Sequence, residues 1–161
     1  MLKLRKNKKG FTLVELIVVI AIMAVLAGVV AGVTVSQLNK NTDKTNLSQA
    51  KGIADFVAGE IADITNDSVY ENGELSATKI KSTILTQYAS VNFKKESNAI
   101  ADAPTSKGQF AVKVNEASSK VTSVDILYMN KSGGDVKGYT VSADGVITNY
   151  QAPAANANNN G

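Results

Sequence analysis

An uninterrupted apolar run near the N-terminus constrains this chain more than any other feature. From Leu16 to Val33 there are 18 consecutive apolar or glycine residues with no charge among them. At 1.5 Å per residue, a helix from Phe11 to Val35 is about 37 Å long, which is enough to cross a hydrocarbon core of about 30 Å. The sequence therefore predicts one membrane-spanning helix at residues 11–35.

The charges that flank this run predict its orientation. The first ten residues contain no acid and five cations, which are Lys3, Arg5, Lys6, Lys8 and Lys9. Clustered cations hold the preceding end of a span on the cytoplasmic side, so the rest of the chain is expected outside. Without those five cations the chain carries 12 basic and 14 acidic residues, a net charge of −2. We therefore predict no nucleic-acid partner.

The 161 residues include no Cys and no His, which argues against catalysis. The chain thus lacks disulfides, thiolate metal sites, the commonest general base and the commonest metal ligand. Ser76 and Lys79 match the S-x-x-K pattern of serine acyl-enzymes, but the partner motifs are missing and Ser76 is expected to cap a helix. We predict no enzyme activity and no cofactor.

Three acids in the last third of the chain raise the question of a calcium site, because hard oxygen ligands suit that ion. They are Asp125, Asp135 and Asp144. Their spacing matches no calcium-loop signature, so we interpret them as solvated turn and strand carboxylates. No metal site is predicted.

Glu15 is the residue that an ordinary membrane anchor does not explain. An ionised carboxylate inside an apolar span costs about 2.5–3.5 kcal/mol, and the helix dipole offsets only about 0.3–1 kcal/mol of this. A secretory signal peptide fits no better, because its apolar stretch is usually about 7–15 residues long and ends at a small-residue site. A cut between Gly10 and Phe11 would create an α-amino group four residues from Glu15, in the same chain or a neighbouring one.

The segment from Lys8 to Glu15 resembles the processing site of type IV prepilins, in which a basic leader ends in Gly, followed by Phe and then by Glu at the fifth mature position. The resemblance covers about residues 5–65. It implies that a prepilin peptidase cleaves after Gly10 and methylates Phe11. It also implies that Glu15 pairs with an N-terminal amine during assembly.

The same resemblance implies a structural subunit that polymerises with copies of itself into a surface filament. The precursor would sit in membrane lipid as a single-pass protein of the cytoplasmic membrane, and assembly machinery with an ATPase motor would move it into the pilus. Adhesion, motility or biofilm formation follow from the family alone. A type II secretion pseudopilin or a competence pilin shares the processing site, and a membrane-anchored surface protein is the alternative from another class. The absence of Cys departs from many Gram-negative pilins and points to a Gram-positive source.

Gly28 and Gly32 leave two interpretations open. Many type IVa pilins carry a proline midway along the span, where this chain has Gly32. Each glycine weakens a helix by about 1 kcal/mol relative to alanine, which favours local unwinding in a filament. The same two glycines form a G-x-x-x-G pattern, which favours close packing between helices.

Beyond residue 35 the apolar pattern becomes one-sided, which predicts a helix covering a sheet. The apolar positions recur every three or four residues and are Ala50, Ile53, Ala54, Val57, Ile61 and Ile64. One helix is therefore expected from about Phe11 to Ile64, with its N-terminal half apolar on all sides.

A short second helix and four strands are predicted after the long helix. The helix follows Ser76, and the strands cover residues 110–114, 121–129, 136–142 and 146–150. Short turns between the strands favour an antiparallel meander. The fold class is thus α+β, and the resemblance implies that it is the type IV pilin fold, a very long N-terminal helix packed on an antiparallel meander. The predicted parts are a leader (1–10), a span or filament core (11–35), a globular domain (36–151) and a flexible tail (152–161).

Overall fold

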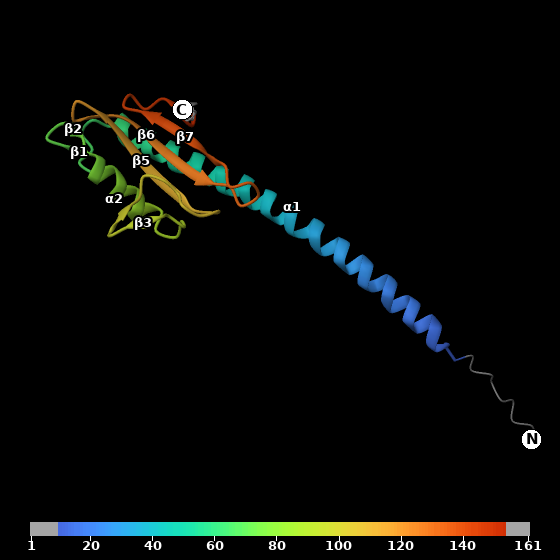
Figure 1. Ribbon diagram of the computed structural model, residues 1–161. Helices are drawn as coiled ribbons and strands as arrows, with labels where there is room; N and C mark the ends of the chain where they lie inside the picture. Colours follow the sequence, from blue (N-terminus) through green and yellow to red (C-terminus); the bar gives the residue numbers. More distant parts are fainter. Residues whose placement is uncertain (1–9, 154–161) are drawn as a thin grey trace, which may run out of the picture. The chain divides into compact units, whose positions relative to one another are not determined.

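The computed structural model describes residues 10–153 and has the α+β fold expected, a long N-terminal helix and a C-terminal antiparallel sheet (Figure 1). The elements are α1 (Leu13–Ala62), β1 (Tyr70–Glu71), β2 (Glu74–Leu75), α2 (Ala77–Gln87), β3 (Lys95–Glu96), β4 (Ala99–Ile100), β5 (Phe110–Ala117), β6 (Lys120–Met129), β7 (Val136–Ser142) and β8 (Ile147–Asn149). The chain forms two compact units, residues 1–38 and 39–161. Residues 1–9 of the predicted leader and 154–161 of the predicted tail lie outside the described residues.

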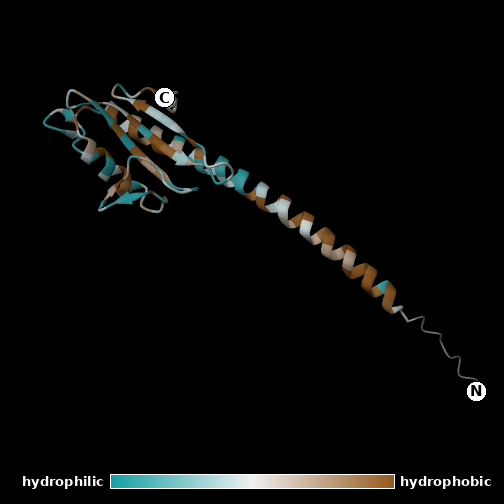
Figure 2. Cartoon of the chain, in the orientation of Figure 1, coloured by the Kyte–Doolittle hydropathy of each residue, from teal (hydrophilic) through white to brown (hydrophobic). Residues whose placement is uncertain are grey.

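In the first unit, α1 exposes apolar side chains on all sides. It begins at Leu13, and the large apolar residues from there to Leu38 are 43–73 % exposed. Figure 2 shows this stretch as almost continuously hydrophobic. By length and composition it can cross a membrane. A helix that is hydrophobic all round requires lipid or other helices as its surroundings.

In the second unit, α1 buries one face. Ala50, Ile53, Ala54, Val57 and Ile61 are at most 3 % exposed and belong to the core cluster. This confirms the predicted apolar face, with one error. Ile64 lies beyond the end of the helix and is 70 % exposed, because the helix stops at Ala62 and its periodicity no longer places that side chain.

The main sheet has the order β5-β6-β7-β8, and every neighbouring pair is antiparallel. Its core side chains pack together with the buried face of α1, and they include Phe110, Val112, Val124, Ile126, Tyr128 and Val141. The predicted meander is confirmed, but β5 extends to Ala117 instead of residue 114. The turn is only Ser118-Ser119, both with positive φ (51° and 63°), which suits a two-residue type I′ hairpin.

Two small hairpins escaped the sequence analysis. β1 and β2 pair around Asn72-Gly73, whose φ angles are 53° and 79°, and β3 pairs with β4 around residues 97–98. Asn-Gly is the typical sequence of a type I′ turn, so the first hairpin did carry a sequence signal. Strands of two residues are too short to show a period-two pattern.

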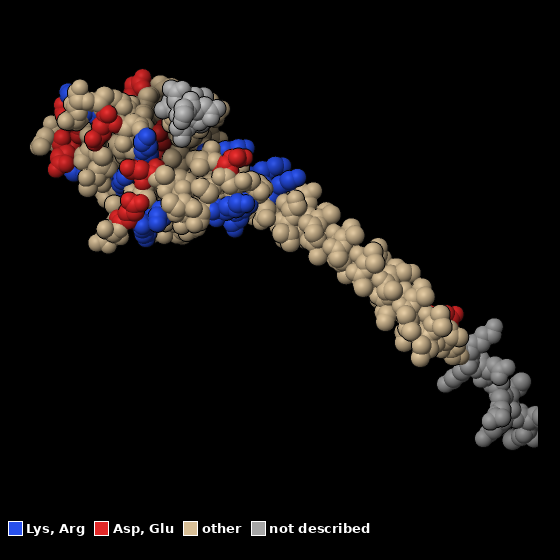
Figure 3. All heavy atoms as spheres, viewed as in Figure 1, with Lys and Arg blue, Asp and Glu red and all other residues tan. Residues whose placement is uncertain are grey.

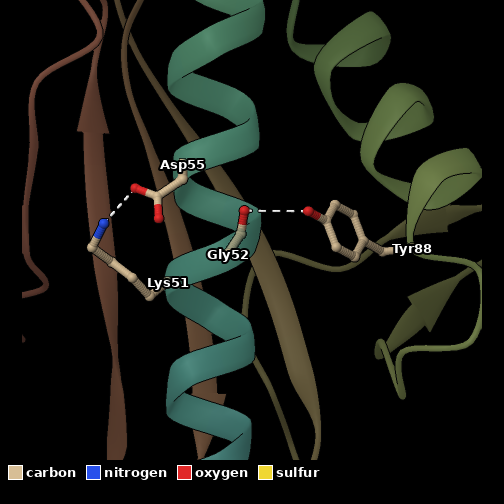
Figure 4. Close-up of polar contacts among 4 residues, drawn as sticks. All are labelled: Lys51, Gly52, Asp55 and Tyr88. Atoms are coloured by element: carbon tan, nitrogen blue, oxygen red, sulfur yellow. Dashed lines mark hydrogen bonds and ion pairs between the residues drawn. The ribbon is translucent and has the colours of Figure 1, made fainter.

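Helix α2 is tied to α1 from its C-terminal end. The hydroxyl of Tyr88 donates to the carbonyl of Gly52 at 3.2 Å (Figure 4). The Tyr88 ring also packs edge-on against Phe56. Lys51 and Asp55 form an ion pair along the same stretch of α1. Ser76 does occupy the N-cap position, but its side chain makes no cap bond and donates instead to Glu71 Oε2 (3.2 Å). The predicted N-cap position of Ser76 is therefore confirmed, whereas the expected capping hydrogen bond is not formed.

A buried carboxylate fastens the β6–β7 loop to α1. Asp43 is 8 % exposed, and its oxygens accept bonds from the Tyr128 hydroxyl (2.7 Å), the Lys131 amide (2.7 Å), and both the amide (3.0 Å) and hydroxyl of Ser132. Burial on its own would raise the pKa of Asp43. The bonds from Ser132, Tyr128 and Lys131 outweigh burial and lower the pKa to about 2.

A second buried acid lies on the opposite face of the sheet. Asp125 in β6 is 6 % exposed and accepts bonds from Asn115 Nδ2 (2.8 Å) and Thr140 Oγ1 (2.7 Å), which stand on the two flanking strands. The prediction of a solvated carboxylate was wrong for this residue. Its neighbours supply the hydrogen bonds that a buried carboxylate requires.

Replacing Gly138 with Ala should strongly destabilise the sheet. A Cβ on Gly138 would lie 1.8 Å from the backbone oxygen of Ile126, and a backbone atom in a central ladder cannot move aside cheaply. We expect a loss of about 3 kcal/mol in unfolding free energy, measured by urea titration of the full chain in micelles. Gly59→Ala in α1, where nothing lies within 4 Å, should stabilise by about 0.5–1 kcal/mol. Equal changes in unfolding free energy for Gly138→Ala and Gly59→Ala would contradict the predicted clash at Gly138.

The Asp43 cluster should make the second unit sensitive to acid. The carboxyl has a pKa of about 2 when folded and 3.8 as its ordinary value, so its stabilisation is present above pH 4 and is lost as the pH falls through 2. The difference corresponds to about 2 kcal/mol. Asp43→Asn should therefore lower the unfolding free energy at pH 7 and flatten its fall between pH 4 and pH 2. Tyr128→Phe removes one of the four bonds to Asp43. This variant should therefore show a smaller loss of unfolding free energy at pH 7 and a smaller change in its fall between pH 4 and pH 2.

Candidate functional site

The start of α1 combines an accessible peptide bond with a charged group. Gly10, Phe11 and Thr12 precede the helix without regular secondary structure, and the Phe11 side chain is 87 % exposed. Nothing lies within 4 Å of the position that a Cβ on Gly10 would take. The predicted cleavage position, between Gly10 and Phe11, is therefore open to an enzyme and outside the helical hydrogen-bond pattern.

Thr12 and Glu15 form a capping box that the sequence analysis missed. The backbone amide and the hydroxyl of Thr12 both donate to Glu15 Oε2, each at 2.8 Å. In return the amide of Glu15 donates to Thr12 Oγ1 at 3.3 Å. The signal was available, because Thr-x-x-Glu immediately before an apolar run is the sequence signature of this cap.

The capping box offsets part of the free-energy cost of placing the Glu15 carboxylate in an apolar helix. One carboxylate oxygen, Oε2, accepts two hydrogen bonds, and the carboxylate stands in the first turn, where the helix dipole favours a negative charge. No bond to Oε1 is found among residues 10–153. One oxygen is thus held within the chain, and the other remains available to a group from elsewhere.

Farther along the apolar segment, the polar and glycine positions are accommodated within continuous helix. The Thr34 hydroxyl donates to the carbonyl of Val30 (2.8 Å), which satisfies it without water. Gly28 and Gly32 have no atoms within 4 Å of the place where a Cβ would stand. That open space on one side of the helix suits a second helix approaching closely, while the choice between packing and unwinding remains a prediction.

The groups considered for chemistry do not form a reactive site. Lys79 donates to the carbonyls of Asp67 (3.1 Å) and Tyr70 (2.8 Å), while Ser76 bonds Glu71. Within the described part of the chain, no three carboxylates lie close enough to hold a metal ion. A hollow of about 520 Å³ beside α2 contains the ion pair of Lys81 and Asp102, and otherwise mostly small polar and apolar side chains.

Comparison with known proteins identifies the same segment. The family described as Prokaryotic N-terminal methylation motif matches residues 5–31, which include the predicted cleavage position, Glu15 and most of the apolar run. This motif is the signature of type IV pilins and prepilins, and it belongs to structural subunits and not to enzymes. No curated protein and no solved structure matches the chain. The chain therefore carries the N-terminal signature of a pilin-like precursor, and α1 is long and apolar enough to cross a membrane.

Replacing Thr12 with Val should loosen the first turn of α1. The change removes the hydroxyl that bonds both the carboxylate and the amide of Glu15, and keeps the side-chain shape. Loss of an N-cap costs about 1 kcal/mol, so exchange of the Glu15 amide hydrogen should accelerate about fivefold in micelles, as measured by NMR. Thr34→Val removes a hydroxyl from the middle of the segment and serves as the control. Unchanged exchange in Thr12→Val would show that the box does not hold the turn.

Proposed function

We propose that this chain is the precursor of a structural subunit of a type IV pilus, cut between Gly10 and Phe11 and polymerised through its N-terminal helix. The observation that carries the proposal is the position of Glu15, a lone acid in the first turn of an otherwise apolar helix, five residues after Gly10. Such an acid requires a positive partner at its own depth. In this mechanism the amine freed by cleavage supplies that partner.

Geometry at the helix start supports the pairing. The Thr12 amide already bonds Glu15 Oε2, and after cleavage the residue directly before it, Phe11, would carry the new amine. That amine could approach Glu15 within one chain, or reach the Oε1 atom of a neighbouring chain. A charge-assisted bond of this kind is about twice as strong as a neutral one, and the apolar surroundings strengthen it further.

Polymerisation follows from the exposed apolar surface of residues 13–38. In the membrane, lipid covers these side chains. In a filament, the same segments would cover one another and form the core, while the globular part, residues 36–151, would form the outer surface. Prepilin peptidase, the assembly machinery and its ATPase motor would act on the subunit, which performs no chemistry itself. The surface role in adhesion, motility or biofilm formation belongs to the same proposal.

The test compares Glu15→Gln with wild type in a host that assembles the filament. Gln keeps the shape of Glu and can accept the Thr12 bonds, but it carries no charge. We expect normal membrane insertion and at least a tenfold loss of sheared filaments, measured by immunoblot and electron microscopy. Glu96→Gln, at an exposed position in β3, is the matched control. Normal filament yield from Glu15→Gln would contradict the pairing.

Gly10→Val provides the separate control for processing. A β-branched residue at the cleavage position should leave the uncut precursor in the membrane. Mass spectrometry of wild-type subunits should find N-methylated Phe11 at the N-terminus. Filament subunits that still begin at Met1 would exclude the proposed cleavage.

A further inference from the structure

Four lysines gather at one end of the second unit, and we call this surface the basic end. Two of them are on α1 and two are on loops next to it, and they are Lys40, Lys44, Lys107 and Lys131. All four side chains are exposed. Figure 3 shows several basic side chains gathered at this end and others spread over the unit, while most acids lie toward the other end.

The loop before β5, which holds Lys107, and the loop between β6 and β7, which holds Lys131, contact each other at this surface. A Cβ on Gly108 would lie 2.7 Å from Cε of Lys131, and a Cβ on Gly134 would lie 3.3 Å from Cε of Lys107. Each loop thus provides a glycine beside the aliphatic stem of the other loop's lysine. Both glycines have positive φ, 84° and 82°. The Asp43 cluster fixes the same region to α1, because the Lys131 amide is one of its donors.

The charge of this surface is not cancelled within the unit. None of the four lysines takes part in the salt bridges found among residues 10–153, which join Lys51 to Asp55, Lys81 to Asp102 and Lys120 to Glu74. Asp43 lies at this end as a buried carboxylate that accepts four hydrogen bonds from neutral groups, so its negative charge offsets one of the four positive charges. Asp135 is exposed in the loop before β7 and reduces the positive charge in part.

The far end of the unit carries the opposite charge. Five acids lie near the end of α1 and in the β1–β2 region, with Lys79 and Lys120 bound among them, and the acids are Glu60, Asp63, Asp67, Glu71 and Glu74. The net charge of −2 for residues 11–161 therefore conceals a separation of charge along the unit. Composition alone could not show this separation, because it counts charges without locating them.

The basic end lies close in sequence to the apolar segment. After Glu15 the next charged residue is Lys40, so residues 16–39 form an uncharged stretch. As helix, those residues extend about 36 Å, compared with about 30 Å for a hydrocarbon core and about 40–45 Å for a bilayer with its headgroups. When the segment spans a bilayer, Lys40 therefore stands at the level of the outer headgroups, and Lys44 is one helical turn beyond it.

We propose that the basic end binds anionic phospholipid headgroups of the bilayer that holds the apolar segment. The inference rests on the membrane-inserted state of the proposed function and adds a second contact to it. The phosphate of an anionic lipid is the ligand that exposed, unpaired ammonium groups at headgroup level attract. The contact would hold the globular unit at the membrane surface until assembly extracts the subunit.

Two other partners fit a basic surface less well. Nucleic acid would also offer phosphates, and the acidic end of a second copy would offer carboxylates. Nothing in the chain brings nucleic acid or a second copy close to Lys40. The membrane-spanning segment, in contrast, keeps Lys40 within about one Debye length of the lipid headgroups. Both alternatives give distinct results in the experiment.

The experiment uses the full chain in nanodiscs and a single-cysteine probe. The protein has no Cys, so Ser106→Cys, an exposed position beside Lys107, accepts one fluorophore without competing thiols. Spin-labelled headgroups quench this fluorophore when the basic end contacts the bilayer. Discs of neutral phosphatidylcholine are compared with discs containing 30 % anionic phosphatidylglycerol. The test variant carries Lys40→Gln, Lys44→Gln, Lys107→Gln and Lys131→Gln, and the matched control carries Lys94→Gln, Lys95→Gln, Lys113→Gln and Lys120→Gln.

We expect anionic lipid to increase the ratio of bound to free basic end about tenfold in wild type and in the control. The test variant should lose this increase, and 0.5 M NaCl should abolish it. Equal quenching in neutral and anionic discs would overturn the inference. So would lysine-dependent binding of duplex DNA, or of a second copy, in neutral discs without any effect of anionic lipid. Protein that fails to enter either kind of disc would contradict the proposed function itself, which is a separate result.

Discussion

The face of α1 that lies on the sheet is the contact on which the second unit depends. Ala50, Ile53 and Val57 are almost fully buried there, and the strands of the meander cover them with their own apolar side chains. With no disulfide available, burial of this apolar surface is the main source of stability. The same helix has no such cover from residue 13 to residue 38, so its N-terminal part must take its stability from lipid or from other subunits.

Two carboxylates on α1, Asp43 and Glu15, differ in how their charge is stabilised. Asp43 is buried among four protein donors, which lower its pKa and leave it no need of a cation. Among the described residues 10–153, Glu15 is bonded through the capping box with Thr12, which satisfies one of its oxygens. The first acid is therefore structural and complete within the chain. The second is the acid for which the proposed function supplies a partner.

Sequence patterns gave most of the large elements correctly. Eighteen apolar residues in succession and a repeat of three and four were strong signals for α1, and alternation located β6 and β7 to within a residue. The errors occurred where signals are short. Two-residue strands carry no period, and Ser76 caps α2 by position without the expected bond. At the candidate site, Gly10, Phe11 and Glu15 stay predictions, whereas Thr12, which the structure shows bonded to Glu15, was overlooked although its spacing from Glu15 was informative.

The sequence by itself determined that an uncharged apolar helix follows a cluster of cations, and that an acid and a prepilin-like motif stand at its start. Those conclusions need only composition and order along one helix. Only the tertiary structure decided that Asp43 and Asp125 are buried, and that loop and helix lysines form one basic end. The partners of these residues are far away in sequence, as Asp43 and Ser132 are, and no local pattern records which distant groups folding brings together.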